Sequence, residues 1–327
     1  MNIYEQQRSN RRKTWLVLLL FLAFFAILGL GFDAFQLGTL NAVPLPVATI
    51  AALSFGSTSA LVSYFAGGRA VLASTGALAA SDALARAQTP DETLRLRQFE
   101  NVVDEMAIAA GLPRPKSYVV PDPDPNAFAT GRDPEHASIA VTRGLLETLN
   151  RDELQGVVAH EMSHIRNFDI RLMTVVAALV GAVALIADWA VRGMGMRGLS
   201  GRGRRGQGGG AQLLFMVVWI LTAALAPIVS QLLATAISRR REFLADASGA
   251  ELTRNPLALA NALGKVDRAA APTKAIKRGS AHLCIADPTG RRFERRAGRL
   301  ADLFATHPPV EQRIEALRRM AYQGVEG

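Results

Sequence analysis

Four stretches of the chain carry no charged residue over a length that can cross or enter a bilayer. Trp15–Phe32 would form a helix of about 27 Å, close to the roughly 30 Å thickness of a hydrocarbon core. The other three stretches are Val43–Phe65, Leu172–Ala187 and Ala211–Ile237. This pattern predicts a mainly helical integral membrane protein.

The first apolar stretch has two interpretations. Four basic residues precede it, as in a signal peptide: Arg8, Arg11, Arg12 and Lys13. It is longer than the usual apolar core of a signal peptide, and Gly29–Asp33 is a poor cleavage site, so an uncleaved transmembrane helix is favoured. The loop after it has no Lys or Arg, whereas Arg69 follows the second stretch, which places the N-terminus in the cytoplasm.

The last two apolar stretches leave the topology open. Leu172–Ala187 is short for a span, and the segment between the two, residues 193–210, is rich in Gly and Arg. That segment would lie outside if both stretches cross, against the positive-inside rule; if they only dip into the bilayer or pack on the protein, the conflict disappears. We expect two further spans. RNA binding by residues 193–210 is an alternative, but they include no aromatic residue, so we interpret them as a flexible loop near anionic headgroups.

Between the second and third stretches the apolar periodicity indicates an α+β domain. Apolar residues recur on one face of Pro90–Gly111, and Gly111 supplies a helix stop. Ser117–Val120, Asn126–Gly131 and Ala137–Thr142 predict three strands of a small antiparallel sheet.

Composition narrows these interpretations only slightly. The net charge of +9 suits anionic lipid and nucleic acid equally. The single cysteine, Cys284, excludes an internal disulfide and has no partner cysteine for a zinc site. The positive mean hydropathy supports membrane segments.

A metal-binding motif lies on the helix that follows the strands. Asn150 and Glu153 form a capping-box pattern at its start. His160 and His164 are four residues apart, so both imidazoles project from one face and can bind one ion, and Glu161 can act as a general base toward water. We expect this helix to continue through Asn167 toward the third apolar stretch. Zinc suits such nitrogen ligands, and His136 and His282 are expected to be structural.

The third ligand must come from another segment. Glu242 and Asp246 follow the fourth apolar stretch one helical turn apart. Glu242 can coordinate zinc while Asp246 accepts a hydrogen bond from a ligand imidazole. Alternatively, both acids merely balance Arg239–Arg241 at the membrane surface.

Taken together, these motifs resemble the HtpX heat-shock membrane proteases, relatives of the CAAX prenyl endopeptidases. The resemblance rests on residues 101–170, Glu242–Asp246 and Thr306–Pro309, and extends over nearly the whole chain. It implies a zincin-like metalloprotease domain with Glu242 as third zinc ligand, and oxyanion stabilisation by His307 and Arg313. It also implies that extended substrate pairs with the strand formed by Asn126, Ala127, Phe128, Ala129 and Thr130.

The resulting expectation is a zinc metalloendopeptidase with one Zn²⁺ per chain. It would cleave unfolded or misfolded membrane proteins, and some soluble ones, as stress-related quality control in the inner (plasma) membrane, with its catalytic domain facing the cytoplasm. The expected parts are a basic segment (1–14), a transmembrane hairpin (15–65), the two parts of the protease domain (66–171 and 238–327) and two apolar segments between them (172–237). The alternatives are a CAAX-type protease acting on lipidated peptides and a catalytically silent scaffold or chaperone.

Overall fold

The computed structural model describes residues 3–40, 45–181, 239–269, 273, 275–276, 283–286 and 308–323. Its helices are α1 (Ile3–Leu40), α2 (Val47–Ser74), α3 (Ala80–Ala85), α4 (Pro90–Ala110), α5 (Arg143–Thr148), α6 (Arg151–Arg166), α9 (Arg239–Thr253), α10 (Pro256–Arg268) and α13 (Val310–Gln323). A helix also covers residues 169–181, and a short 3₁₀ turn covers Pro134–His136. The strands are β1 (Leu78–Ala79), β2 (Lys116–Val120), β3 (Ala127–Thr130) and β4 (Ser138–Thr142). The prediction of a mainly helical protein with a small sheet is confirmed.

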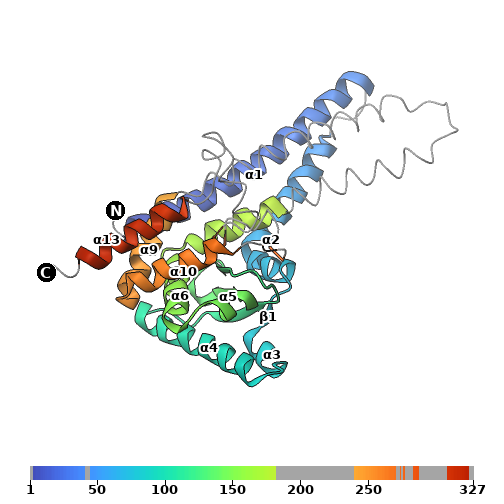
Figure 1. Cartoon of the computed structure of the whole chain (residues 1–327). Coiled ribbons are helices and arrows are strands. Elements are labelled where there is room, and N and C mark those ends of the chain that lie inside the picture. The colour runs from blue at the N-terminus through green and yellow to red at the C-terminus, as the bar shows by residue number, and fades with distance from the viewer. Residues whose placement is uncertain are drawn as a thin grey trace.

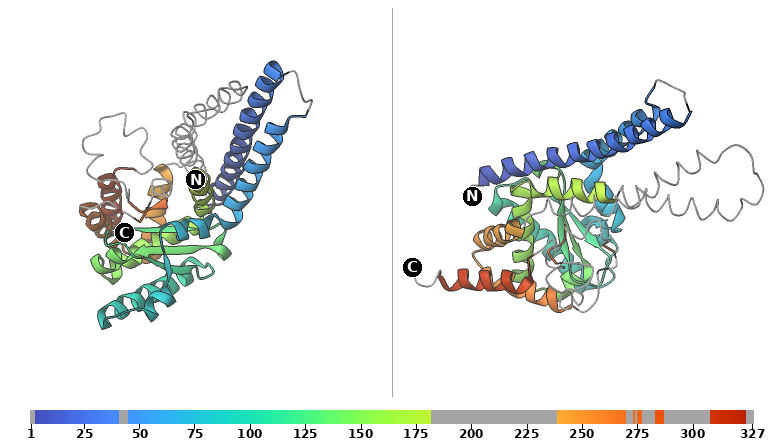
Figure 2. Two further views of the ribbon diagram at one scale, coloured as in Figure 1. Left: turned by 90° about the vertical axis from the view of Figure 1, so that its right-hand side faces the viewer. Right: turned by 90° about the horizontal axis from the view of Figure 1, so that it is seen from above.

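The first two helices form a hairpin that projects beyond the rest of the described residues (Figures 1 and 2). Within them, Gln7–Gly31 and Val47–Ser74 are long and apolar enough to cross a membrane. Many large apolar side chains of the hairpin are exposed, among them Trp15, Leu19, Ile27, Leu61 and Phe65. Such a surface suits lipid rather than water.

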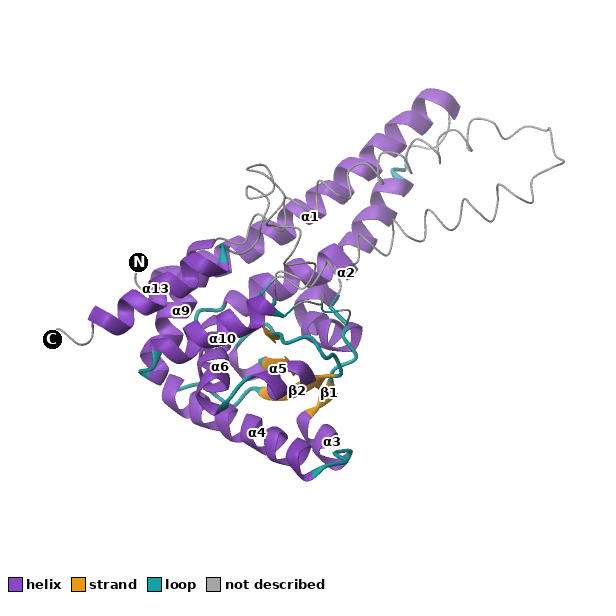
Figure 3. Ribbon diagram, in the orientation of Figure 1, coloured by secondary structure: helices purple, strands orange, loops and turns teal. Residues whose placement is uncertain are grey.

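The sheet is mixed, so the prediction of an antiparallel sheet is wrong. Its strand order is β1-β2-β4-β3, with β2 parallel to β4 and the other two pairs antiparallel. Figure 3 shows the strands in orange among the helices. The chain leaves β2, crosses to the far side of β4, forms β3 there and returns as β4. The two-residue strand β1 was not predicted, because so short a strand has no periodicity of its own.

The loop between β2 and β3 explains this strand order. It passes so close to Gly144 that a Cβ at that position would lie 1.9 Å from the carbonyl oxygen of Pro123. Gly144 also donates its backbone N–H to the carbonyl of Asp122, 3.0 Å away. A glycine at the start of α5 therefore lets the loop reach the outer side of β4.

The sheet is buried on both faces. One face packs with α4, α6 and α10 in a core that contains Phe99, Ile139, Val157 and Leu259. The other face, with Phe128 and Ala140, packs against the base of the hairpin and the beginning of the 169–181 helix. Both faces of β3 and β4 are therefore inaccessible to water.

The helix that carries the metal motif begins as predicted but ends earlier. Asn150 caps α6, and the capping box with Glu153 is complete. The helix stops at Arg166, and Phe168 adopts a left-handed conformation (φ 57°) before the chain becomes helical again at residue 169. The expectation of one helix continuing through Asn167 is wrong, because the backbone turns there to bring Asp169 back toward α6.

The topology of the later apolar stretches stays a prediction. Residues 182–187, the Gly- and Arg-rich segment 193–210 and the stretch Ala211–Ile237 lie outside the described residues. In the part of the third stretch that the structure describes, Leu172, Val176 and Leu179 are buried against the hairpin and the sheet.

Candidate metal centre

The two histidines of the motif lie together on the buried face of α6. Their Nε2 atoms are 3.2 Å apart, and the rings meet edge to face. Both side chains are almost inaccessible, at 0% for His160 and 3% for His164. Spacing of four residues on a helix produces this pairing.

The third group comes from α9, which crosses α6 at close range. Oε2 of Glu242 lies 3.8 Å from Nε2 of His160, and Oε1 lies 3.8 Å from Nε2 of His164. The three candidate ligand atoms are within 4.8 Å of one another. Bonds of roughly 2.0–2.1 Å in tetrahedral geometry place ligand atoms about 3.3 Å apart, so two imidazoles and one carboxylate arranged in this way fit a zinc ion.

The ring of His160 is held from behind by a buried ion pair. Its Nδ1 atom is 2.9 Å from Oδ1 of Asp246, one turn beyond Glu242 on α9. Arg313 of α13 donates two hydrogen bonds to the Asp246 carboxylate, at 2.8 and 2.7 Å. Burial tends to raise the pKa of Asp246, but the Arg313 charge outweighs this and lowers it, so Asp246 stays ionised.

The ring of His164 is held by a different acid. Its Nδ1 atom is 3.0 Å from Oδ2 of Asp169, which is fully buried in the turn after α6. The other oxygen of Asp169 accepts a hydrogen bond from Asn10 of α1 at 2.6 Å and lies 3.4 Å from Arg241. Burial lowers the pKa of His164, but the bond to Asp169 and the nearby carboxylates outweigh it and raise the pKa to about 9. The carboxylates around His164 therefore stabilise a positive charge on its ring, and a metal ion would have to displace that proton, because only the neutral imidazole is a ligand.

Glu161 lies beside the two histidines and is 1% exposed. Burial raises its pKa, an effect that the two histidines oppose and Glu242 reinforces. The backbone amide of Ala129 in β3 is close enough to lower this pKa slightly. The glutamate of the motif thus lies between the histidines and the strand expected to bind substrate.

The outer edge of β3 is partly occupied by the chain itself. Ile285 donates its backbone N–H to the carbonyl of Ala127 at 2.9 Å, and Phe128 forms an antiparallel bridge with Cys284. The Asn126 side chain donates to the carbonyl of Ala286 at 3.1 Å. Three of the five residues expected to contact substrate therefore contact residues 283–286 instead.

The remaining predicted residues have different positions. Thr130 hydrogen-bonds through its hydroxyl to Thr174, 2.9 Å away. His307 and His282 lie outside the described residues. His136 is exposed and bonds to Asp133 and Arg132, as a structural residue would.

Asp169, Asn10 and Arg241 were not identified from the sequence. Asp169 follows His164 by five residues, a spacing that faces away on a continuous helix, and only the turn at Asn167 and Phe168 brings it to the imidazole. No local signal connects Asn10, on the first helix, with the metal motif.

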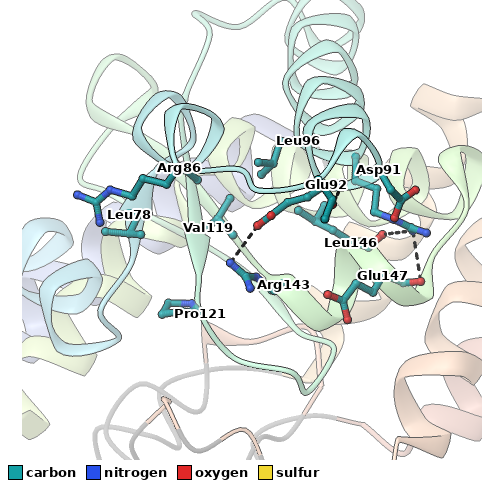
Figure 4. Close-up of a pocket in the computed structure, with 13 residues that line it drawn as sticks. Leu78, Arg86, Asp91, Glu92, Leu96, Val119, Pro121, Arg143, Leu146 and Glu147 are labelled. Carbon is teal, nitrogen blue, oxygen red and sulfur yellow. Dashed lines mark hydrogen bonds and ion pairs between the residues drawn. The ribbon is translucent and has the colours of Figure 1, made fainter.

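A separate pocket of about 230 Å³ lies among β1, α3, α4, β2 and α5 (Figure 4). Four of its charged side chains form two ion pairs: Arg143 lies 3.0 Å from Glu92, and Arg95 lies 2.8 Å from Asp91. None of the three candidate ligands lines it. We therefore place the functional site at the histidines.

Comparisons with known proteins identify the family of the chain. Residues 93–321 match the family described as Peptidase family M48. The chain is 40% identical to a protein named Protease HtpX homolog from Caldanaerobacter subterraneus over 319 residues, 97% of this chain and 98% of that one. It is 39% identical to the protein of the same name from Streptococcus gordonii over 318 residues, 97% of this chain and 100% of that one. The resemblance stated from the motifs is confirmed.

A similarity to a solved structure is weaker. The crystal structure of S. mikatae Ste24p aligns with 67% of this chain and 49% of its own, at 17% sequence identity and a TM-score of 0.37.

Proposed function

The chain belongs to peptidase family M48 and is a membrane metalloprotease, and from this premise we propose that it is a zinc-dependent endopeptidase that cleaves unfolded polypeptides at the membrane surface. The observation that carries the proposal is the buried group of His160, His164 and Glu242, with Glu161 beside it. These three residues would hold one Zn²⁺. The ion supplies a Lewis acid and makes water a nucleophile near neutral pH.

Glu161 is the proposed general base. It would accept a proton from the attacking water and pass it to the leaving amine. Its burial and its raised pKa suit a group that must take up a proton and release it near neutral pH.

Substrate is proposed to bind in extended form at the end of β3 near Glu161. In an antiparallel pair, alternate residues direct their backbone groups to opposite sides. The carbonyl of Asn126 accepts a hydrogen bond from Thr142 at the end of β4. The carbonyl of Ala127 faces outward and accepts one from Ile285. Ala129 is the next residue that faces outward, and its amide is beside Glu161. A substrate strand at Ala129 would place a peptide carbonyl near the metal group.

Arg313 is proposed to act through Asp246 rather than on the oxyanion. Two of its nitrogens bind Asp246, and the third donates to the carbonyl of Ile285 at 2.8 Å and lies 3.6 Å from Glu242. The side chain is 0% exposed. These contacts support a role in positioning His160 and Glu242.

The substrates are proposed to be misfolded membrane proteins, with some soluble ones, cleaved on the cytoplasmic side. Asn10 contacts the turn after α6, so the metal site lies near the point where α1 becomes an apolar, exposed helix. The basic residues just before this point favour the cytoplasmic side. An extended substrate strand favours unfolded chains over compact ones.

The test is cleavage of unfolded casein by the purified full-length protein, wild type beside Glu161→Gln, with zinc content measured for both. We expect zinc-dependent cleavage by the wild type only and about one zinc in each. Cleavage by Glu161→Gln would exclude Glu161 as the base. Absence of cleavage by both, with zinc bound, would favour a scaffold or chaperone.

A second experiment tests the substrate edge. Opposite residues of an antiparallel pair lie close enough for a disulfide after small shifts, so Phe128→Cys can be oxidised onto Cys284. The register that pairs Phe128 with Cys284 also sets Leu283 opposite Ala129, so a substrate strand at Ala129 requires residues 283–286 to leave β3. Oxidation should therefore inhibit casein cleavage, and dithiothreitol should restore it. Equal rates for the oxidised and reduced forms would exclude substrate pairing at Ala129. Phe128→Ser controls for loss of the ring.

A further inference from the structure

The turn that follows α6 is held by the first turns of α1. Gln7 donates its side-chain amide to the carbonyl of Arg166 at 2.8 Å. Asn10 donates to the carbonyl of Asn167 at 2.9 Å, and the Arg11 guanidinium lies 4.6 Å from the centre of the Phe168 ring. Consecutive turns of α1 therefore contact consecutive residues of this segment, which supplies Asp169.

Asn10 contacts Asp169 directly and is itself buried, with 2% of its surface exposed. Its Nδ2 group donates to Oδ1 of Asp169 at 2.6 Å while also donating to Asn167. Oδ2 of the same carboxylate faces Nδ1 of His164 at 3.0 Å. One amide thus fixes both the backbone of the turn and the rotation of the carboxylate that orients the imidazole.

Two cations near Asp169, Lys13 and Arg241, do not duplicate this role. Lys13 acts on Asp169 through its charge. Arg241 reaches the same oxygen only at 3.4 Å, a long hydrogen bond. As a buried cation it attracts the carboxylate without directing Oδ2 toward His164. The short, buried bond from Asn10 is the contact that selects the orientation.

We propose that Asn10 is a positioning residue of the metal centre, so that the N-terminal helix completes the support of His164 in addition to anchoring the protein. The proposal rests on the proposed zinc site. It requires residues 7–14 to lie on the same side of the membrane as the site, and it requires α1 to be retained rather than cleaved as a signal peptide. Outer contacts of this kind fix the ring orientation and the basicity of a ligand histidine.

The test uses the full chain in detergent and compares Asn10→Leu with Gln7→Leu. Both changes remove a hydrogen bond between α1 and the same turn, but only Asn10 touches Asp169. Zinc affinity is measured by competition with a chromophoric chelator, and the visible spectrum of the Co²⁺-substituted protein reports ligand geometry without any assay of activity. We expect Asn10→Leu to lower zinc affinity about threefold to tenfold and to change the Co²⁺ bands, and Gln7→Leu to do neither.

Two outcomes separate this inference from the proposed function. If the wild type binds no zinc, the proposed function fails first. If the wild type binds zinc and Asn10→Leu matches Gln7→Leu in affinity and spectrum, α1 is an anchor only and the inference is wrong. Asn10→Ala, which cannot introduce a steric clash, is measured in parallel and should change both readouts in the same direction.

Discussion

The two imidazoles of the proposed metal centre are supported by different parts of the molecule. His160 is backed by Asp246 and Arg313, an ion pair formed between α9 and α13. His164 is backed by Asp169 and by Asn10, which belongs to the N-terminal hairpin. The support of His160 lies within the body of the protein and ends at the buried Arg313. The support of His164 extends to α1, the helix that continues into the apolar hairpin.

This difference indicates how the site responds to damage. Removing Arg313 leaves buried carboxylates without a cation, which destabilises the fold as well as the site. Removing Asn10 leaves Asp169 still near Arg241, so mainly the orientation of one ring changes. Substitutions behind His160 should therefore lower the stability of the fold as well as zinc affinity. Substitutions behind His164 should have a smaller effect, confined to zinc affinity.

The largest effect is expected for Arg313→Met. The variant retains the volume but removes the cation beside Asp246 and Glu242, and we expect a loss of about 3–5 kcal/mol of stability. The measurement is the thermal melting of the full chain in detergent, with Arg313→Lys as the control. Lysine keeps the charge but not the two parallel hydrogen bonds, so it should melt between methionine and wild type. A methionine variant that melts like the wild type would contradict the role of this ion pair.

An intermediate effect, on zinc affinity, is expected for substitutions of Asp246 and Asp169. Asp246→Asn and Asp169→Asn should each lower zinc affinity, by about 10–100-fold, because each removes the charged acceptor of a ligand histidine. The Asp246 variant should lose more, because it also leaves Arg313 buried without its carboxylate. Chelator competition measures both, and Asp152→Asn, an exposed acid on α6, should bind zinc like the wild type. A greater loss of zinc affinity in Asp169→Asn than in Asp246→Asn would mean that the support from the hairpin contributes more to metal binding.

The smallest effect on zinc affinity is expected for a glycine substitution where α9 crosses α6. In Gly249→Ala the new Cβ would lie 3.0 Å from the backbone nitrogen of His160, and in Gly156→Ala it would lie 3.0 Å from that of Leu259. Both must move a neighbouring helix, and both gain about 1 kcal/mol of helix propensity in partial compensation. Only Gly249→Ala shifts α9, which carries Glu242, so only this variant should lose zinc affinity, by a few fold. Equal zinc affinities in the two variants would mean that the site tolerates movement between α6 and α9.

Local patterns in the sequence were sufficient for several elements. The start of α6 at Asn150, the shared face of His160 and His164, and the helix stop at Gly111 all depend on residues within a few positions of one another. The two apolar helices of the hairpin are equally local, since length and hydropathy define them. Each of these features follows from helix geometry and capping chemistry alone.

The partners of these elements depend on packing between distant segments. From local sequence, Glu242 and Asp246 were equally suited to supporting a metal and to balancing Arg239–Arg241. Local sequence also favoured a continuous helix through Asn167. The close crossing of α9 over α6 and the left-handed turn at Phe168 decide these contacts, because close approach of backbones depends on the whole fold. The sequence by itself therefore determined the pair of histidines, the glutamate beside them and the apolar hairpin. The tertiary structure alone decided that β2 and β4 run parallel and that residues 283–286 occupy part of the β3 edge. It also decided that Asp169 and Asn10 lie behind His164. Most of these contacts join residues far apart in the chain. Asp169 is only five residues from His164, but its contact depends on the turn at Asn167 and Phe168, which no local periodicity encodes.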